Sequence, residues 1–133
     1  MNRDEILAME PGRELDALVA EKVMGWKTVN NKTGIPVSGF DWVGHNPKTQ
    51  SSTVWSYVPD YSTDISAAWE VVEKLSRGKV DRSFVLEFHY ERYYASFGPY
   101  REEMYETPSE AICKAALLAV LEDINLPEEG TEQ

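Results

Sequence analysis

The sequence predicts a mixed α/β (α+β) fold, a sandwich in which a small, mainly antiparallel sheet packs with about three helices. Helical and strand-like hydrophobic periods alternate along the chain in the order helix, strands, helix, strands, helix. The length of 133 residues and the hydrophobic fraction of 42% fit one folded domain with a sizeable core. We expect this domain to span residues 1–126, and we expect 127–133 to form an acidic, disordered tail.

Three segments have the apolar spacing of an amphipathic helix. The first covers 13–24 and is expected to stop at Gly25, because glycine readily takes the left-handed conformation at a helix end. The second follows caps at 62–64 and carries an apolar stripe that includes Trp69. The third begins at a capping box and is expected from about Pro108 to Asp123. Its apolar residues cover most of its circumference, which indicates burial in the core or in a subunit interface.

Strand signals fill the regions between these helices. The predicted strands are 26–29, 39–43, 53–58, 83–90, 92–97 and 101–105. The second and third of them are separated by a polar connection and suit a hairpin. Alternation in 83–90 places Phe84, Leu86, Phe88 and Tyr90 on one face, and Val85, Glu87 and His89 on a solvated face.

The composition excludes several classes of protein. The chain has 13 Lys plus Arg against 23 Asp plus Glu, and its formal charge of −10 argues against a general DNA or RNA binder. Cys113 is the single cysteine, so one chain can form neither a disulfide nor a cysteine-based zinc site. No apolar run approaches a membrane span, and Met1–Met9 has no signal-peptide pattern, so we expect a cytosolic protein.

One polar cluster could support catalysis. Glu87, His89 and Glu91 recur with a period of two, which would place two carboxylates and an imidazole on one strand face. Such a face could hold a divalent metal or orient His89 as a general base. The simpler interpretation is a solvated sheet face, and we favour it. No common enzyme motif occurs elsewhere in the chain, so we expect neither an enzyme nor a cofactor.

Ligand binding is the other chemistry that the sequence offers. Small polar residues crowd the helix start at 59–64, which suits either an anion site or, as we favour, ordinary capping. Aromatic residues are concentrated in the β regions, where Tyr and Trp could stack on a planar ligand, and Arg92 and Arg101 could add local positive charge. Arg13 could clamp a ligand or, as we favour, pair at the surface with an acid on a neighbouring turn, such as Glu14, Asp16 or Glu21. The predicted ligand-binding residues are Trp55, Tyr61, Ser62, Thr63, Arg92 and Tyr94.

Three stretches, Met1–Trp26, Pro59–Leu75 and Pro108–Glu122, resemble the small phage and prophage proteins of Bacillus-type hosts that carry the phage ABA-sandwich domain. The resemblance implies an α/β/α sandwich encoded by a phage and acting in the cytoplasm of its bacterial host. It supplies no catalytic residues to carry over.

Two hypotheses for function follow. Small acidic phage proteins resemble counter-defence factors, so the first is a non-enzymatic sponge that sequesters a nucleotide-derived immune signal, with homo-oligomers formed through the last helix. The alternative is an acidic module that inhibits a host protein. A metal-dependent hydrolase at Glu87, His89 and Glu91 is a third, weaker hypothesis. None of the three involves long nucleic acid or a membrane.

Overall fold

The computed structural model describes residues 2–30, 42–49, 55–77, 84–97 and 104–125. The mixed α+β prediction is confirmed, since these residues form four helices and two small antiparallel sheets. The helices are α1 (Arg3–Ala8), α2 (Arg13–Lys22), α3 (Ile65–Ser76) and α4 (Pro108–Asn125). The strands are β1 (Lys27–Asn30), β2 (Val43–His45), β3 (Ser56–Tyr57), β4 (Phe84–His89) and β5 (Arg92–Phe97), with a 3₁₀ turn at Pro47–Thr49.

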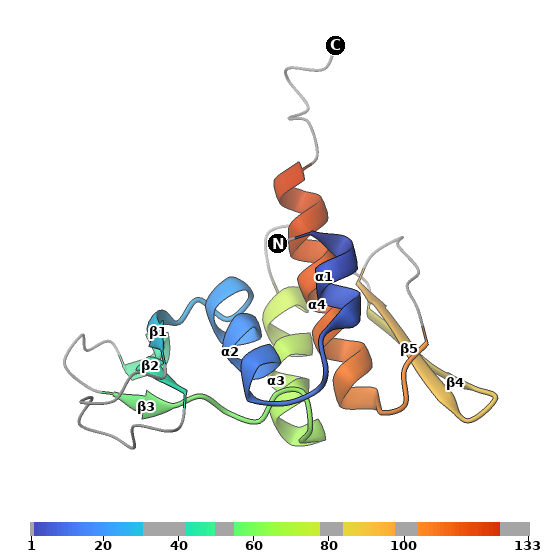
Figure 1. The fold of residues 1–133 in the computed structure, drawn as a ribbon, viewed down its shortest axis with the longest axis horizontal. Helices are drawn as coiled ribbons and strands as arrows, with labels where there is room; N and C mark the ends of the chain where they lie inside the picture. Colours follow the sequence, from blue (N-terminus) through green and yellow to red (C-terminus); the bar gives the residue numbers. More distant parts are fainter. Residues whose placement is uncertain (1, 31–41, 50–54, 78–83, 98–103, 126–133) are drawn as a thin grey trace, which may run out of the picture.

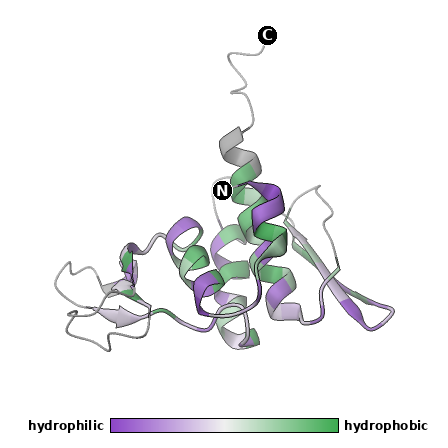
Figure 2. Cartoon of the chain, in the orientation of Figure 1, coloured by the Kyte–Doolittle hydropathy of each residue, from purple (hydrophilic) through white to green (hydrophobic). Residues whose placement is uncertain are grey.

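The four helices occupy the middle of the molecule, and the two sheets lie at opposite ends of this helical cluster (Figure 1). Helix α4 is central, because it contacts the other three helices and also β5. Its residues 111–119 are all buried, and it is hydrophobic over much of its visible length (Figure 2). The apolar circumference that the sequence showed is therefore accounted for by the core of a single chain.

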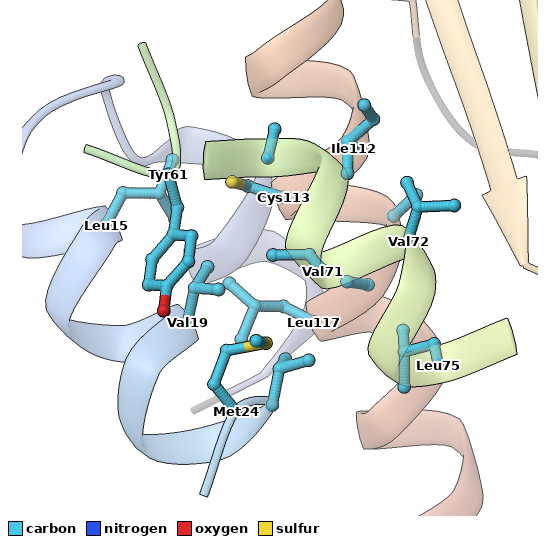
Figure 3. Close-up of a cluster of buried hydrophobic side chains, with 14 of the residues drawn as sticks. Leu15, Val19, Met24, Tyr61, Val71, Val72, Leu75, Ile112, Cys113 and Leu117 are labelled. Carbon is cyan, nitrogen blue, oxygen red and sulfur yellow. The ribbon is translucent and has the colours of Figure 1, made fainter. Parts of the chain in front are cut away.

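The core is built where α2, α3 and α4 meet, and Figure 3 shows this cluster around Tyr61, Val71 and Cys113. Burial raises the pKa of the Cys113 thiol well above its usual range, so this cysteine packs as a small apolar residue. Trp69 was predicted to join the core, but it is 45% exposed and meets Phe84 edge-on with 5.9 Å between ring centroids. It lies toward the β4–β5 side of α3, where the helical core ends.

Helix ends follow the predicted signals closely. Gly25 takes a φ of 82°, and the Trp26 N–H reaches the Ala20 carbonyl at 2.9 Å, which closes α2 as expected of a left-handed glycine. Helix α1 was not predicted from the sequence, although its signal was present. The Asn2 side chain accepts from the Glu5 N–H while Glu5 accepts from the Asn2 N–H, a complete capping box.

Strands β1, β2 and β3 form one antiparallel sheet with β2 in the centre. The predicted hairpin is confirmed in the pairing of β2 with β3, and its parts at 39–41 and 50–54 lie outside the described residues. A side chain at Gly44 in β2 would be crowded by the neighbouring strand β1. A β-carbon there would stand 3.0 Å from Val29 Cγ2 and 3.1 Å from the Lys27 carbonyl oxygen.

Strands β4 and β5 form a separate two-stranded sheet with continuous register from Phe84↔Phe97 to His89↔Arg92. The linking residues Tyr90 and Glu91 have φ values of 52° and 62°, so a two-residue turn with both positions left-handed closes the hairpin. The hairpin extends beyond the helices (Figure 1).

The expected inward face of β4 is only partly buried. Phe84 packs against the core, but Leu86, Phe88 and Tyr90 are 37%, 59% and 95% exposed. The prediction that this whole face packs inward is wrong, because α4 covers β5 while the outer strand and the turn project past the helix. Of the strand predicted at 101–105, residues 101–103 lie outside the described residues, and Tyr105 forms an isolated antiparallel bridge with Tyr93.

Candidate functional site

The most elaborate polar cluster links the start of α2 to the segment before α3. Arg13 Nη1 donates to Asp16 Oδ2 at 2.9 Å, to Asp60 Oδ1 at 2.6 Å and to the Pro59 carbonyl at 3.3 Å. Arg13 Nη2 donates to the Val58 carbonyl at 2.6 Å. The pairing of Arg13 with Asp16 matches the simpler sequence interpretation. The contacts with residues 58–60 could not be predicted, because they cross more than forty positions of sequence.

Asp16 is fully buried and completes the cluster from α2. Its Oδ1 accepts the Ser62 N–H at 2.7 Å, while the Ser62 hydroxyl accepts the Gly12 N–H at 2.8 Å. Burial raises the pKa of the Asp16 carboxyl, and this effect outweighs the opposing hydrogen bonds from Ser62 and the nearby charge of Arg13. In this cluster Arg13 therefore pairs with a carboxyl group of its own chain, where a ligand-binding arginine would pair with a bound anion.

The helix start at 59–64 behaves as the capping interpretation predicts. Asp64 is the N-cap of α3 and accepts the Ser66 N–H at 3.0 Å. Ser62 is buried and its N–H and hydroxyl are engaged with Asp16 and Gly12, so these groups do not face solvent. Thr63 is exposed beside them.

The six predicted ligand-binding residues do not converge on one described pocket. Tyr61, Ser62 and Thr63 share one turn, but the first two are only 1% and 0% exposed. Trp55 precedes β3 and stacks on His45 with ring centroids 4.2 Å apart. The remaining two lie on β5 at the opposite end of the molecule (Figure 1), where Arg92 is exposed and Tyr94 is buried. Arg101 lies outside the described residues.

The Glu87–His89–Glu91 arrangement is only partly present. His89 Nε2 lies 2.9 Å from Glu87 Oε1, and both side chains are on the same face of β4. Glu91 belongs to the left-handed turn rather than to the strand, so the period of two does not extend to it. Within the described ranges, no three His, Cys, Asp or Glu side chains are grouped so that they could hold a metal ion.

Two surface grooves were not predicted from the sequence. The first, called here the α2 groove, has a volume of about 250 Å³ and is lined by Met9, Glu14, Ala17, Leu18, Glu21, Val29 and Trp42. The second, called the α3 groove, has a volume of about 360 Å³ and is lined by Met24, Lys48, Glu70, Glu73, Lys74 and Arg77. The only advance signal for the α2 groove was the spacing of Glu14, Leu18 and Glu21, which places them on one side of a helix.

Comparison with known proteins places this fold in a class of phage proteins. The family model described as the phage ABA sandwich domain matches residues 17–117. The chain therefore belongs to the phage ABA sandwich domain family, which confirms the resemblance seen in the sequence.

A solved structure supports the same assignment. The crystal structure of a phage protein from Bacillus cereus ATCC 14579 is similar to this chain, with a TM-score of 0.54 and 26% sequence identity. The match covers 83% of this chain and 91% of that protein. No curated protein sequence matches the chain. Among the described residues, no helix is both long and apolar enough to cross a lipid bilayer.

Proposed function

We propose that this phage protein is a non-enzymatic interaction protein that captures a basic amphipathic helix of a host protein in the α2 groove. The observation that carries the proposal is the lining of the groove. Its lining is largely apolar, with Ala17 and Leu18 from α2, Val29 from β1 and Trp42 just before β2, and the charged residues in its lining are both glutamates.

The spacing of the two carboxylates suggests the form of the partner. Glu14 and Glu21 are exposed and seven residues apart on α2, which corresponds to about 10 Å along the helix axis. The half-buried Leu18 lies between them on the same side of the helix. Lys and Arg side chains suit this surface, because their apolar stems can cover the floor while their cationic ends reach the carboxylates. A helix with cations two turns apart meets both requirements.

The charge of the whole protein favours the same partner. With a formal charge of −10, the surface attracts a basic segment at long range and accelerates encounter. Capture of this kind would block whatever the host segment normally contacts.

A synthetic amphipathic helix with lysines seven positions apart is a direct probe of the groove. We expect fluorescence anisotropy to show binding that weakens as salt increases, because screening reduces the attraction of the carboxylates. The double variant Glu14→Lys/Glu21→Lys should raise Kd by at least about tenfold, as expected for two lost charge contacts.

A matched control separates the groove from the overall charge. The variant Glu70→Lys/Glu73→Lys makes the same change of charge on α3, away from the α2 groove, and should alter Kd far less. Equal losses in the two variants would show that only net charge matters, and absence of binding to the wild type would overturn the proposal.

The sponge for a nucleotide-derived signal is a second candidate, favoured by the α3 groove. Three of the six residues that line this groove are cations, a local positive surplus in an acidic protein. One of them, Lys48, lies 3.8 Å from Glu70, so phosphate would compete with this carboxylate. None of the six ligand-binding residues predicted from the sequence lines the α3 groove, and their role in binding stays a separate prediction.

The test of the sponge uses cyclic ADP-ribose isomers and cyclic dinucleotides as ligands. A bound ligand at a hundred times its Kd would stabilise the protein by about 2.7 kcal/mol and raise its melting temperature by several degrees. Heating should then release the ligand intact. Lys74→Glu should abolish the shift, whereas Lys22→Glu on α2 should keep it. An unchanged melting temperature with every ligand would exclude the sponge.

A further inference from the structure

Strand β4 has a hydrogen-bonding edge to which no described strand is paired. Tyr93 exchanges both backbone hydrogen bonds with Tyr105, at 2.7 and 2.6 Å, so its N–H and C=O point away from β4. Phe88 is paired with Tyr93, and in an antiparallel ladder the backbone groups of such a pair both point outward. By alternation, the N–H and C=O of Phe84, Leu86 and Phe88 are directed to the outer edge of β4, where no described strand pairs with them.

Within the described residues, this edge shows little of the usual protection against pairing. Natural edge strands are commonly guarded by lysine, proline or a bulge. The strand sequence FVLEFH contains neither lysine nor proline, and its register with β5 is regular over all six residues. Val85, Leu86 and Phe88 are 39%, 37% and 59% exposed, so apolar side chains accompany the open backbone groups.

We propose that β4 pairs antiparallel with β4 of a second copy of this chain, around a two-fold axis at Leu86. In this register Leu86 lies opposite the partner's Leu86, and Phe84 lies opposite the partner's Phe88. All three outward-facing residues then form hydrogen-bonded pairs, and the two hairpins join into one four-stranded sheet.

A second copy fits this edge because the strand is complementary to itself. Every directly opposed pair on one face is apolar. On the other face, Val85 lies opposite the partner's Glu87, so no like charges are directly opposed. Glu87 is the one acidic residue of the strand, so each copy brings only one carboxylate to the paired β4 strands.

Sedimentation velocity over a range of protein concentrations tests the pairing. The wild-type protein should form dimers, and added salt should tighten them because it screens repulsion between two molecules of charge −10. In the Leu86→Lys variant the two introduced lysines face each other across the two-fold axis. Their repulsion should raise the dimer Kd by at least about tenfold. Val85→Lys introduces the same charge at similar exposure but faces the partner's Glu87, so the dimer should be retained or tightened.

Oxidative cross-linking tests the register itself. Hydrogen-bonded antiparallel pairs have Cα atoms about 5.5 Å apart, within the range of a disulfide. Leu86→Cys should therefore form a covalent dimer under mild oxidation. Val85→Cys should not, because position 85 lies opposite position 87 of the partner, so the two introduced cysteines are not paired. The native Cys113 is buried and should not interfere.

Three outcomes would overturn the proposal: a wild-type protein that stays monomeric, equal loss of dimer in both lysine variants, or cross-linking of Val85→Cys alone. The dimer and the peptide capture can fail independently. The dimer is strengthened by salt and depends on β4, whereas capture is weakened by salt and depends on α2.

Discussion

Replacing Arg13 by alanine is expected to lower the free energy of unfolding by about 3 kcal/mol, near the lower end of the cost of breaking a buried ion pair. The substitution removes the guanidinium that pairs with Asp16. The Asp16 side chain is only 1% exposed, so its carboxylate is left buried without a cationic partner. The substitution also removes the donor that reaches the carbonyls of Val58 and Pro59, so α2 is no longer tied to the segment that leads into α3. The effect stays below the largest known values because the Arg13 side chain is 33% exposed. Thermal or urea unfolding measures it.

Two variants show whether the unpaired carboxylate causes this loss. The double variant Arg13→Ala/Asp16→Asn removes both the guanidinium and the carboxylate. Its free energy of unfolding should therefore lie between that of Arg13→Ala and that of the wild type. Lys22→Ala, at the exposed end of the same helix, should change the free energy of unfolding by no more than about 0.5 kcal/mol. If the double variant is no more stable than Arg13→Ala, lost hydrogen bonds rather than buried charge are responsible.

The pH dependence of stability follows from the raised pKa of Asp16. The folded protein holds the proton of this carboxyl more tightly than the unfolded chain, where the pKa is about 3.9. The contribution of Asp16 to stability is therefore complete below that value and decreases as pH rises through the folded pKa. The unfolding free energy of the wild type minus that of Asp16→Asn should decrease from pH 4 upward. The other titrating groups are the same in both proteins, so their contributions cancel in this difference. A difference that increases with pH would contradict the assignment.

The sequence predicts the helices well because their signals are local. The cap at Thr107, the cap at Asp64 and the stop at Gly25 each depend on residues within one turn, and each is found in the structure. Of the capping box predicted at Thr107, the structure shows the half in which the Thr107 hydroxyl accepts the Glu110 N–H at 3.2 Å. Helix α1 has an equally local capping box at Asn2, but a helix of six residues shows too little hydrophobic periodicity to stand out.

What the sequence cannot predict is which surfaces are covered. The apolar alternation of β4 is the same whether a helix covers one face along its whole length or only near Phe84. Trp69 is on the predicted stripe of its helix, yet the core ends before it and leaves it 45% exposed. Both grooves combine residues from separate segments of the chain, so composition and spacing alone could not locate them.

The contacts of Lys114 show the same limit, since a lysine on an apolar helix does not reveal its partners. Lys114 is 2% exposed on α4, and its Nζ donates to Glu110 Oε2 at 2.9 Å and to the Leu7 carbonyl at 3.0 Å. The ammonium also lies 5.3 Å from the centroid of the Tyr105 ring. Leu7 is in the last turn of α1, where carbonyls have no partner within the helix, so Lys114 both caps α1 and attaches it to α4.

Lys114→Met should therefore lower the free energy of unfolding by about 3 kcal/mol, because it leaves a largely buried carboxylate without its cation. Amide hydrogen exchange should increase across residues 3–8 as α1 loses its attachment. Lys74→Met, on the exposed side of α3, serves as the control and should leave both quantities nearly unchanged.

The double variant Glu110→Leu/Lys114→Met separates the ion pair from the carbonyl contact. Replacing both members of a buried pair by apolar residues of similar size is often close to neutral, so this variant should be more stable than Lys114→Met. Exchange in residues 3–8 should nevertheless stay fast, because the Leu7 carbonyl still lacks its donor. If the double variant restores slow exchange as well, α1 is held by packing against α4, and the bond from Lys114 to the Leu7 carbonyl contributes little to its docking.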